Sequence, residues 1–231
     1  MTLEEVLQAC PKAATYFENM PQKLKSRYTI HKFQPGTMIH QKDYSLDYFG
    51  IVCSGSFRVI NEFKNGNIFM IEKNEAVDFL GEVAILAEKP VASVSIQTIT
   101  ECIVFMISRS DFEMWIAEDI HLLRLVAHRV ACKLYQSSYN RGARLFYPPS
   151  ILLLDYIVKY AESNQMDRKV EVTLLKTRED IREELGMNVK MINRAVAKLK
   201  EEGLIDTRKG KVVLSKEQYH RAKEEIGKYV S

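Results

Sequence analysis

The stretch from Thr177 to Leu214 reads TREDIREELGMNVKMINRAVAKLKEEGLIDTRKGKVVL and carries the strongest structural pattern in the chain. Thr177 suits a helix N-cap, and Asp180 follows three residues later in a near match to a capping box. Gly186 suits the tight turn that joins two crossed helices, and Asn188 is placed to cap the second of them. These residues predict a helix-turn-helix.

The second predicted helix has two faces of different chemistry. The residues expected on its inner face recur at helical spacing and are Ile192, Val196 and Leu199. The residues expected on its outer face recur every four positions and are Lys190, Arg194 and Lys198. Such a helix packs on a core with one side and presents positive charge with the other.

A hairpin is predicted directly after these helices. The apolar pair 204–205 precedes the basic run 207–211, and a second apolar run covers 212–214. This order predicts a strand, a basic turn and a strand, which together form a wing. Two short helices with a glycine turn also occur in other small helical domains. The basic helix beside a basic hairpin nevertheless favours binding to the phosphate backbone of double-stranded DNA.

The composition is that of a soluble globular protein. The 231 residues suit one large or two small domains, and 46% of them are hydrophobic and 27% charged. No apolar run approaches the length of a membrane span, and the N-terminal segment carries acidic residues, unlike a secretory signal. We expect a cytoplasmic protein with no membrane partner.

Positive charge is concentrated in the C-terminal part of the chain. Residues 1–140 contain 14 Lys and Arg against 16 Asp and Glu, whereas residues 141–231 contain 19 against 14. The basic excess therefore coincides with the predicted helix-turn-helix, as electrostatic attraction to nucleic acid requires.

Side chains that commonly build catalytic or metal sites are scattered. The four cysteines are Cys10, Cys53, Cys102 and Cys132, and they form no CxxC pair. The five histidines form no HxxxH pattern, and we predict no His–Cys pair. No Ser-His-Asp, paired-carboxylate or phosphate-loop arrangement is visible either. We expect no metal, no cofactor and no enzyme activity.

The first half of the chain consists of short alternating runs separated by glycines. The predicted strands are 28–33, 48–53, 57–60, 68–71, 92–99 and 102–107. Many short strands with glycine turns predict a sandwich or a barrel-like roll. Between two of these strands, residues 79–93 read FLGEVAILAEKPVAS. Gly81 allows close backbone approach there, the start of a short helix can bind an anion, and Glu82 can accept a hydrogen bond from a sugar hydroxyl.

A long helix is predicted from Arg109 to about Asn140. Its apolar residues at gaps of four and three form a heptad seam and are Ile116, Ile120, Leu123, Ala127, Val130 and Leu134. A second apolar face, which would cover the roll, consists of Trp115, Leu122, Leu125 and Val126. Two apolar faces favour packing on the helix's own domain and on a second copy of the chain. The alternative is a helix buried within a single domain.

The resemblance to a known family rests on motifs spread over nearly the whole chain. Pro35-Gly36, Ser54-Gly55, Asn65-Gly66, FLGEVAIL and the later winged helix occur in the order seen in bacterial Crp-Fnr transcription regulators. The resemblance implies an α+β fold with three parts: an effector-sensing β-roll of the cyclic-nucleotide-binding type over 1–110, a dimerisation helix over 111–140, and a winged helix-turn-helix over 141–231. It also implies a homodimer that acts with RNA polymerase.

The glycine-rich corner departs from the nucleotide-binding members that it resembles. In those members an Arg that pairs with phosphate follows the proline of this corner, but here Val91 and Ala92 follow Pro90. Because Val cannot replace a bidentate charged contact, we expect no response to cyclic AMP in the usual way. The candidate residues for contact with a small-molecule effector are Gly81, Glu82, Val91, Ala92, Ser137 and Ser138. For the two serines, the alternative is a polar hinge where the helix ends.

The predicted DNA-binding residues lie on the second helix and on the wing. They are Asn188, Val189, Lys190, Arg194, Lys198, Arg208, Lys209 and Lys211. Arg194 matches a base-contacting Arg of the resembled family, whereas Val189-Lys190 replaces its usual polar pair, so we expect a non-standard half-site. The alternative function is a nucleotide-binding regulatory subunit of an enzyme or channel, which leaves the basic C-terminal domain unexplained.

Overall fold

The computed structural model describes residues 1–229, with the side chains of all of these except residues 139–145. Two units divide the chain, Met1–Gln136 and Ser137–Ser231. Helix α4 (Ile120–Phe146) contributes residues to both of them. Within the described residues, no helix is both long and apolar enough to span a membrane.

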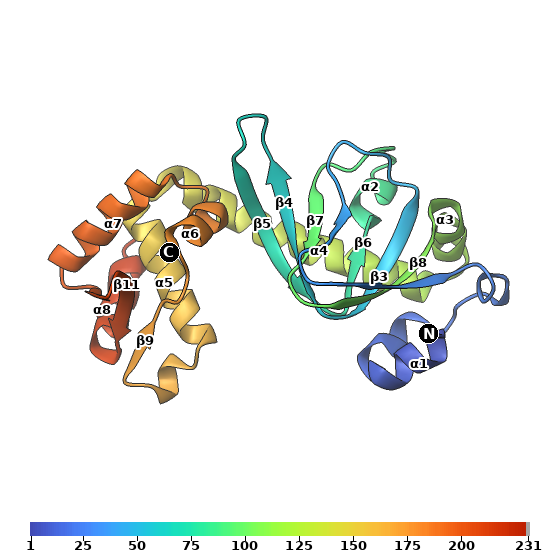
Figure 1. Cartoon of the computed structure of the whole chain (residues 1–231), viewed down its shortest axis with the longest axis horizontal. Helices are drawn as coiled ribbons and strands as arrows, with labels where there is room; N and C mark the ends of the chain where they lie inside the picture. Colours follow the sequence, from blue (N-terminus) through green and yellow to red (C-terminus); the bar gives the residue numbers. More distant parts are fainter. Residues whose placement is uncertain (230–231) are drawn as a thin grey trace. The chain divides into compact units, whose positions relative to one another are not determined.

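The first unit begins with short helical segments that pack beneath the strands (Figure 1). Helix α1 (Leu3–Ala9) starts at a capping box formed by Thr2 and Glu5. Two 3-10 helices follow at Pro11–Tyr16 and Gln22–Leu24. Their buried side chains join the core that contains Phe105 and Trp115.

Two four-stranded antiparallel sheets form the β-roll. The first has the order β1-β8-β3-β6, with β1 at Thr29–Phe33, β3 at Tyr48–Ser54, β6 at Asp78–Leu80 and β8 at Cys102–Ser108. The second has the order β2-β7-β4-β5, with β2 at Met38–His40, β4 at Ser56–Glu62, β5 at Ile68–Glu75 and β7 at Ser95–Thr98. Val52 and Val104 of the first sheet share one core with Phe57 and Ile96 of the second, so the sheets pack face to face.

The strands predicted from alternation are all present, including the hairpin of β4 and β5. The short helix predicted after Gly81 is α2 (Glu82–Leu86). Strands β2 and β6 were not predicted, because three residues are too few to display an alternating pattern.

The single helix predicted from Arg109 to about Asn140 was wrong, since the chain forms α3 (Arg109–Glu118) and then α4. Asp119 separates the two helices with extended φ and ψ angles. Its Oδ1 accepts hydrogen bonds from the backbone N–H groups of His121 and Leu122, as an N-cap does. Ile116 therefore lies on α3, where it packs against the roll core, and does not continue the seam of α4. The helical backbone also extends to Phe146, past the predicted boundary at 140.

The second unit has its own apolar core, formed between helices and a three-stranded sheet. Its helices are α5 (Pro149–Ser163), α6 (Arg178–Leu185), α7 (Val189–Glu201) and α8 (Lys216–Gly227). Its strands are β9 (Glu171–Thr173), β10 (Asp206–Arg208) and β11 (Lys211–Ser215), in the order β10-β11-β9. Leu204 and Ile205, predicted as strand, instead fill the core just before β10. Helix α8 and strand β9 had not been predicted.

Candidate nucleic-acid interface and effector corner

The helix-turn-helix is formed by α6, a glycine turn and α7. Thr177 and Asp180 form the capping box of α6. Gly186 has a φ of 68°, the left-handed conformation that glycine adopts without strain. Asn188 caps α7, because its Oδ1 accepts a hydrogen bond of 2.9 Å from the N–H of Met191. The predicted turn and both caps are confirmed.

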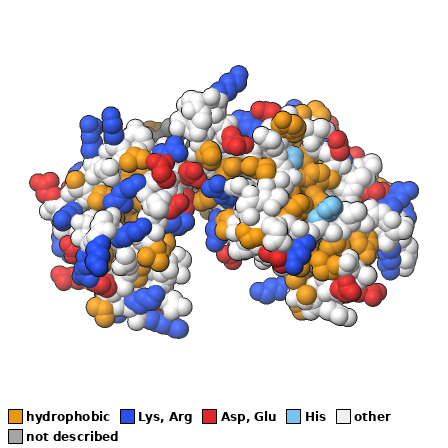
Figure 2. Space-filling model, viewed as in Figure 1, with side chains coloured by type: hydrophobic (Ala, Val, Ile, Leu, Met, Phe, Trp, Pro, Cys, Tyr) orange, Lys and Arg blue, Asp and Glu red, His pale blue; other side chains and the backbone are white. Residues whose placement is uncertain are grey.

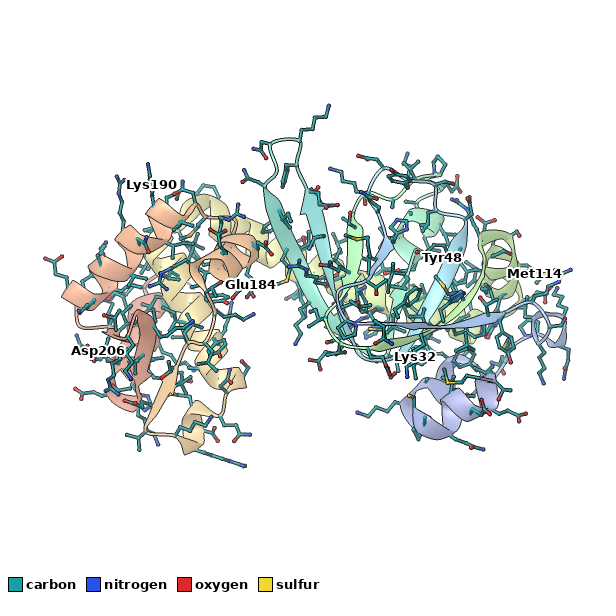
Figure 3. All side chains as sticks on the ribbon, in the orientation of Figure 1. Lys32, Tyr48, Met114, Glu184, Lys190 and Asp206 are labelled. Carbon is teal, nitrogen blue, oxygen red and sulfur yellow. The ribbon has the colours of Figure 1, made fainter. Side chains whose placement is uncertain are left out.

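The two faces of α7 also agree with the prediction. Ile192, Val196 and Leu199 are buried in the core of the second unit. Lys190 and Arg194 are exposed, and Figure 3 shows Lys190 pointing outward from α7. Figure 2 shows Lys and Arg side chains over the surface of this unit, at the left of the view.

The predicted cations differ in whether they are already engaged. Lys198 forms an ion pair with Glu202, Arg208 donates to Glu171 at 2.6 Å, and Lys211 donates to a backbone carbonyl oxygen. Lys190, Arg194 and Lys209 form neither an ion pair nor a side-chain hydrogen bond among the described residues. The unpaired cations are the ones whose charge is available to a phosphate or a base.

The wing is a tight hairpin between β10 and β11. Arg208 pairs with Lys211 across a two-residue turn, Lys209-Gly210. Both turn residues have positive φ angles, 48° and 77°, as in the primed turns that match the twist of a hairpin. The turn places the unpaired Lys209 at the tip of the wing.

Arg178 is an interface candidate that had not been predicted from the sequence. It is the first residue of α6, and its Nε donates a hydrogen bond of 3.2 Å to Oδ1 of Asn193 on α7. Asn193 is exposed and directly precedes Arg194. The signal available in the sequence was an Arg next to the predicted N-cap, beside a predicted basic helix.

A cavity of about 90 Å³ lies in the roll at the glycine-rich corner. Its lining includes Gly81, Glu82 and Ala92, as predicted for an effector site. Val91 does not line it and is 43% exposed. Ser137 and Ser138 belong to the second unit and are exposed.

The backbone at this corner requires glycine. Gly81 has a φ of 86° and precedes α2. A Cβ at this position would lie 2.7 Å from the carbonyl oxygen of Tyr48, too close for any side chain. The N–H of Ala92 is engaged, since it donates to the carbonyl oxygen of Tyr44 at 3.1 Å.

A cluster of charges from α4 covers the carboxylates of the corner. Nζ of Lys133 lies 3.2 Å from Glu82 Oε1 and 3.2 Å from Asp78 Oδ1. Arg129 binds both oxygens of Asp78, each at 3.0 Å. Burial raises the pKa of Glu82, against the attraction of Lys133. Burial lowers the pKa of Lys133, but the facing carboxylates raise it overall, so this ammonium stays charged.

His40 contributes a second polar group to the cavity lining. Its Nδ1 lies 3.3 Å from the hydroxyl of Tyr48, and its buried Nε2 has no hydrogen-bond partner in the described part of the chain. Desolvation lowers the pKa of His40, so the imidazole is neutral at pH 7. The same effect raises the pKa of Tyr48 to about 12.

The prediction that no His–Cys pair exists was wrong. His128 and Cys132 are one helical turn apart on α4, and Sγ lies 3.5 Å from Nε2. Two ligands do not make a metal site, and among the described residues no group of three or more His, Cys, Asp or Glu side chains is placed to hold one.

The seam and the roll-facing side of α4 have opposite environments. Leu122 and Val126 are fully buried against the roll, as predicted. On the seam, Ile120 is 68% exposed and Leu134 is 66% exposed. The other seam residues of α4, which are exposed or half-buried, are Leu123, Ala127 and Val130. A row of accessible apolar side chains thus runs along the helix.

Comparisons with known proteins agree with this geometry. Residues 30–119 match the family described as cyclic nucleotide-binding domain. No curated protein matches the chain. Similar solved structures include the c-di-GMP-responsive global regulator CLP of Xanthomonas campestris, with a TM-score of 0.74 and 18% identity over 87% of this chain and 99% of that one.

Two further structures extend the likeness over most of the chain. A transcriptional regulator of the Crp/Fnr family from Eubacterium rectale has a TM-score of 0.70 and 14% identity, over 90% of this chain and 97% of that one. A CooA mutant from Carboxydothermus hydrogenoformans has a TM-score of 0.67 and 16% identity, over 98% and 96%. The structures from Xanthomonas campestris and Eubacterium rectale are both described as regulators. Residues 30–119 therefore resemble a cyclic nucleotide-binding domain, and the chain has the fold of the Crp/Fnr regulator structures.

Proposed function

We propose that this protein is a cytoplasmic, homodimeric transcription regulator that binds double-stranded DNA through its second unit. The observation that carries the proposal is the pair of unpaired cations, Lys190 and Arg194, on the exposed face of a capped helix within a winged helix-turn-helix. A solvated surface usually pairs many of its charges, as Lys198 and Arg208 are paired here. Cations left without partners on such a helix suit phosphates and base edges.

The residues of this surface divide into two roles. Arg194 suits bidentate binding to a guanine, which is worth roughly 1–3 kcal/mol of discrimination between bases. Lys190 stands one turn before it on the same face. Lys209 at the tip of the wing suits a phosphate. Lys198 and Arg208 suit one once DNA displaces their carboxylate partners, and Lys211 suits one when it leaves its backbone acceptor. Asn188 and Val189 lie at the start of α7 and would face the groove beside Lys190.

The seam of α4 supports the homodimer. Ile120 and Leu134 are both large, apolar and exposed, and a second copy of α4 would cover them. A two-fold dimer presents two recognition helices about one duplex turn apart, so each half-site is read by one copy. In that arrangement the protein would regulate transcription by RNA polymerase.

For the roll, we propose an effector-sensing role that does not use cyclic AMP in the usual way. Val91 lies outside the cavity, and the N–H of Ala92 is already bonded to the backbone. Lys133 is engaged by buried carboxylates, so the cation that faces Glu82 among the described residues is not free for a phosphate. An effector shifts the equilibrium between two arrangements of the chain only by as much as its affinities for them differ.

A mobility-shift selection from fragments of genomic DNA tests the proposal. We expect the full-length protein to enrich discrete fragments that contain two related half-sites. The double variant Lys190→Ala, Arg194→Ala should enrich none, whereas Lys200→Ala, also on α7, should enrich the same fragments as the wild type. If the wild-type protein retards no duplex at low salt, with or without cell extract, the proposed function is wrong.

A further inference from the structure

We infer that Asn193 selects a guanine in the major groove, because Arg178 holds the carbonyl oxygen of its side-chain amide. This inference rests on the proposed function and adds a specificity-determining residue to it. It concerns the hydrogen bond between Arg178, the first residue of α6, and Asn193 on the exposed face of α7.

Asn193 is placed where a base-reading residue must lie. It is exposed, it stands three residues after Lys190, and it directly precedes Arg194. Residues three apart share one face of a helix, so Asn193 lies on the face that carries Lys190. If Lys190 and Arg194 enter the groove, the amide of Asn193 enters with them.

The contact with Arg178 fixes which end of the amide faces the guanidinium. Nε of Arg178 carries a hydrogen and can only donate, so the atom at 3.2 Å is the amide oxygen and not the nitrogen. The two N–H groups of Nδ2 then remain for a ligand. The positive guanidinium beside the oxygen also opposes the approach of a second donor.

This orientation decides between the bases. Reading adenine takes both ends of the amide, since Oδ1 must accept from N6 while Nδ2 donates to N7. Cytosine offers only the N4 donor, which Nδ2 cannot accept. Guanine offers two adjacent acceptors, O6 and N7, to the free N–H groups. Thymine has a single acceptor beside its methyl group, so guanine is the best match.

The contact also orders Arg178. With Nε engaged, the two Nη groups of its guanidinium remain for a phosphate at the edge of the groove. A Lys at this position would keep the charge but lose the planar fork that holds Oδ1. Arg178→Lys therefore separates the orienting effect from electrostatic attraction.

Selection from a pool of random duplexes tests the inference, using the full chain as wild type, Asn193→Ala, Arg178→Lys and Arg194→Ala. We expect Asn193→Ala to lose the preference at one base pair of each half-site. In the wild-type site that pair should be G·C, favoured over A·T by at least fivefold. Arg178→Lys should shift the same pair toward A·T, and Arg194→Ala should alter a different pair.

The outcomes distinguish this inference from the function on which it rests. Absence of any enriched sequence overturns the proposed function and the inference together. An enriched site that Asn193→Ala leaves unchanged, or a wild-type preference for A·T at the Asn193-dependent pair, overturns only the role of Asn193. A preference for G·C that persists in Arg178→Lys overturns the orienting role of Arg178.

Discussion

The ammonium of Lys133 on α4 lies 3.2 Å from Glu82 Oε1, at the glycine-rich corner of the roll. The same ammonium reaches Asp78, whose carboxylate is fully buried and also binds Arg129. Two cations of one helix thus hold two carboxylates of the roll. The corner is already neutralised from within, which favours an effector chemistry other than a phosphate.

Removing Lys133 should destabilise the roll strongly. Lys133→Met leaves Glu82 without its cation and Asp78 with only Arg129, and an uncompensated buried charge is costly. We expect the free energy of unfolding to fall by about 2 kcal/mol. This is less than the usual cost of removing one partner from a buried ion pair, because Arg129 still binds Asp78. Lys73→Met is the matched control, since its pair with Glu75 is exposed and worth less than about 0.5 kcal/mol. If urea unfolding shows the same loss of unfolding free energy for Lys133→Met and Lys73→Met, the stabilising role of Lys133 is wrong.

The raised pKa of Glu82 has a defined consequence for stability. In the unfolded chain the Glu82 carboxyl has a pKa of about 4.3. In the folded chain, burial raises the pKa of Glu82. The folded state therefore binds more protons in the window above 4.3, and the free energy of unfolding falls as the pH rises through it. Glu82→Gln removes this titration.

Melting temperatures of the wild type and Glu82→Gln, measured from pH 4 to pH 8, check this prediction. The variant should gain stability relative to the wild type as the pH rises. The opposite trend would mean that Lys133 lowers the pKa of Glu82 and that attraction outweighs burial.

The proposed dimer depends on the seam of α4. Leu134→Glu places a charge on an apolar position that is exposed in one chain, so the single chain should still fold. We expect the sedimentation mass to fall from that of a dimer to that of a monomer. Tyr135→Glu makes the same change one residue later, outside the heptad seam, and should leave the mass unchanged. If Leu134→Glu still sediments as a dimer, the dimer interface is not the seam of α4.

Base reading by Arg194 predicts an unequal loss of affinity. Arg194→Ala should weaken binding to a selected site by about tenfold or more, while binding to random DNA changes little. Fluorescence anisotropy with both duplexes measures the two constants. Equal losses on the two duplexes would assign Arg194 to phosphate contact alone.

Local patterns predicted most of the fold, and the reasons for the failures are physical. Alternation located the longer strands, and capping residues located α6 and α7. The heptad spacing between Ile116 and Ile120 continues across Asp119, so periodicity could not reveal the break between α3 and α4. Asp119 breaks the helix because its side chain caps the next one, and it also accepts from the indole of Trp115 at 3.2 Å.

The site residues also divide into those that local sequence patterns predict and those that only tertiary packing brings together. The exposed cations of α7 follow from helical spacing alone. Lys133 and Glu82 are 51 residues apart, and only the docking of α4 on the roll brings them together. Arg178 and Asn193 are 15 residues apart on two crossed helices, so their contact depends on the crossing geometry. Sequence spacing shows which residues share a face of one helix or strand, but it does not show which elements contact each other.

The salt dependence of DNA binding tests the central claim most directly. Fluorescence anisotropy of the full chain on a selected duplex should give an association constant that falls steeply and linearly with salt on logarithmic axes. Lys209→Ala should reduce that slope by about one unit and lower affinity for all sequences alike. A protein that shows no affinity for duplex DNA even in dilute buffer would contradict the account.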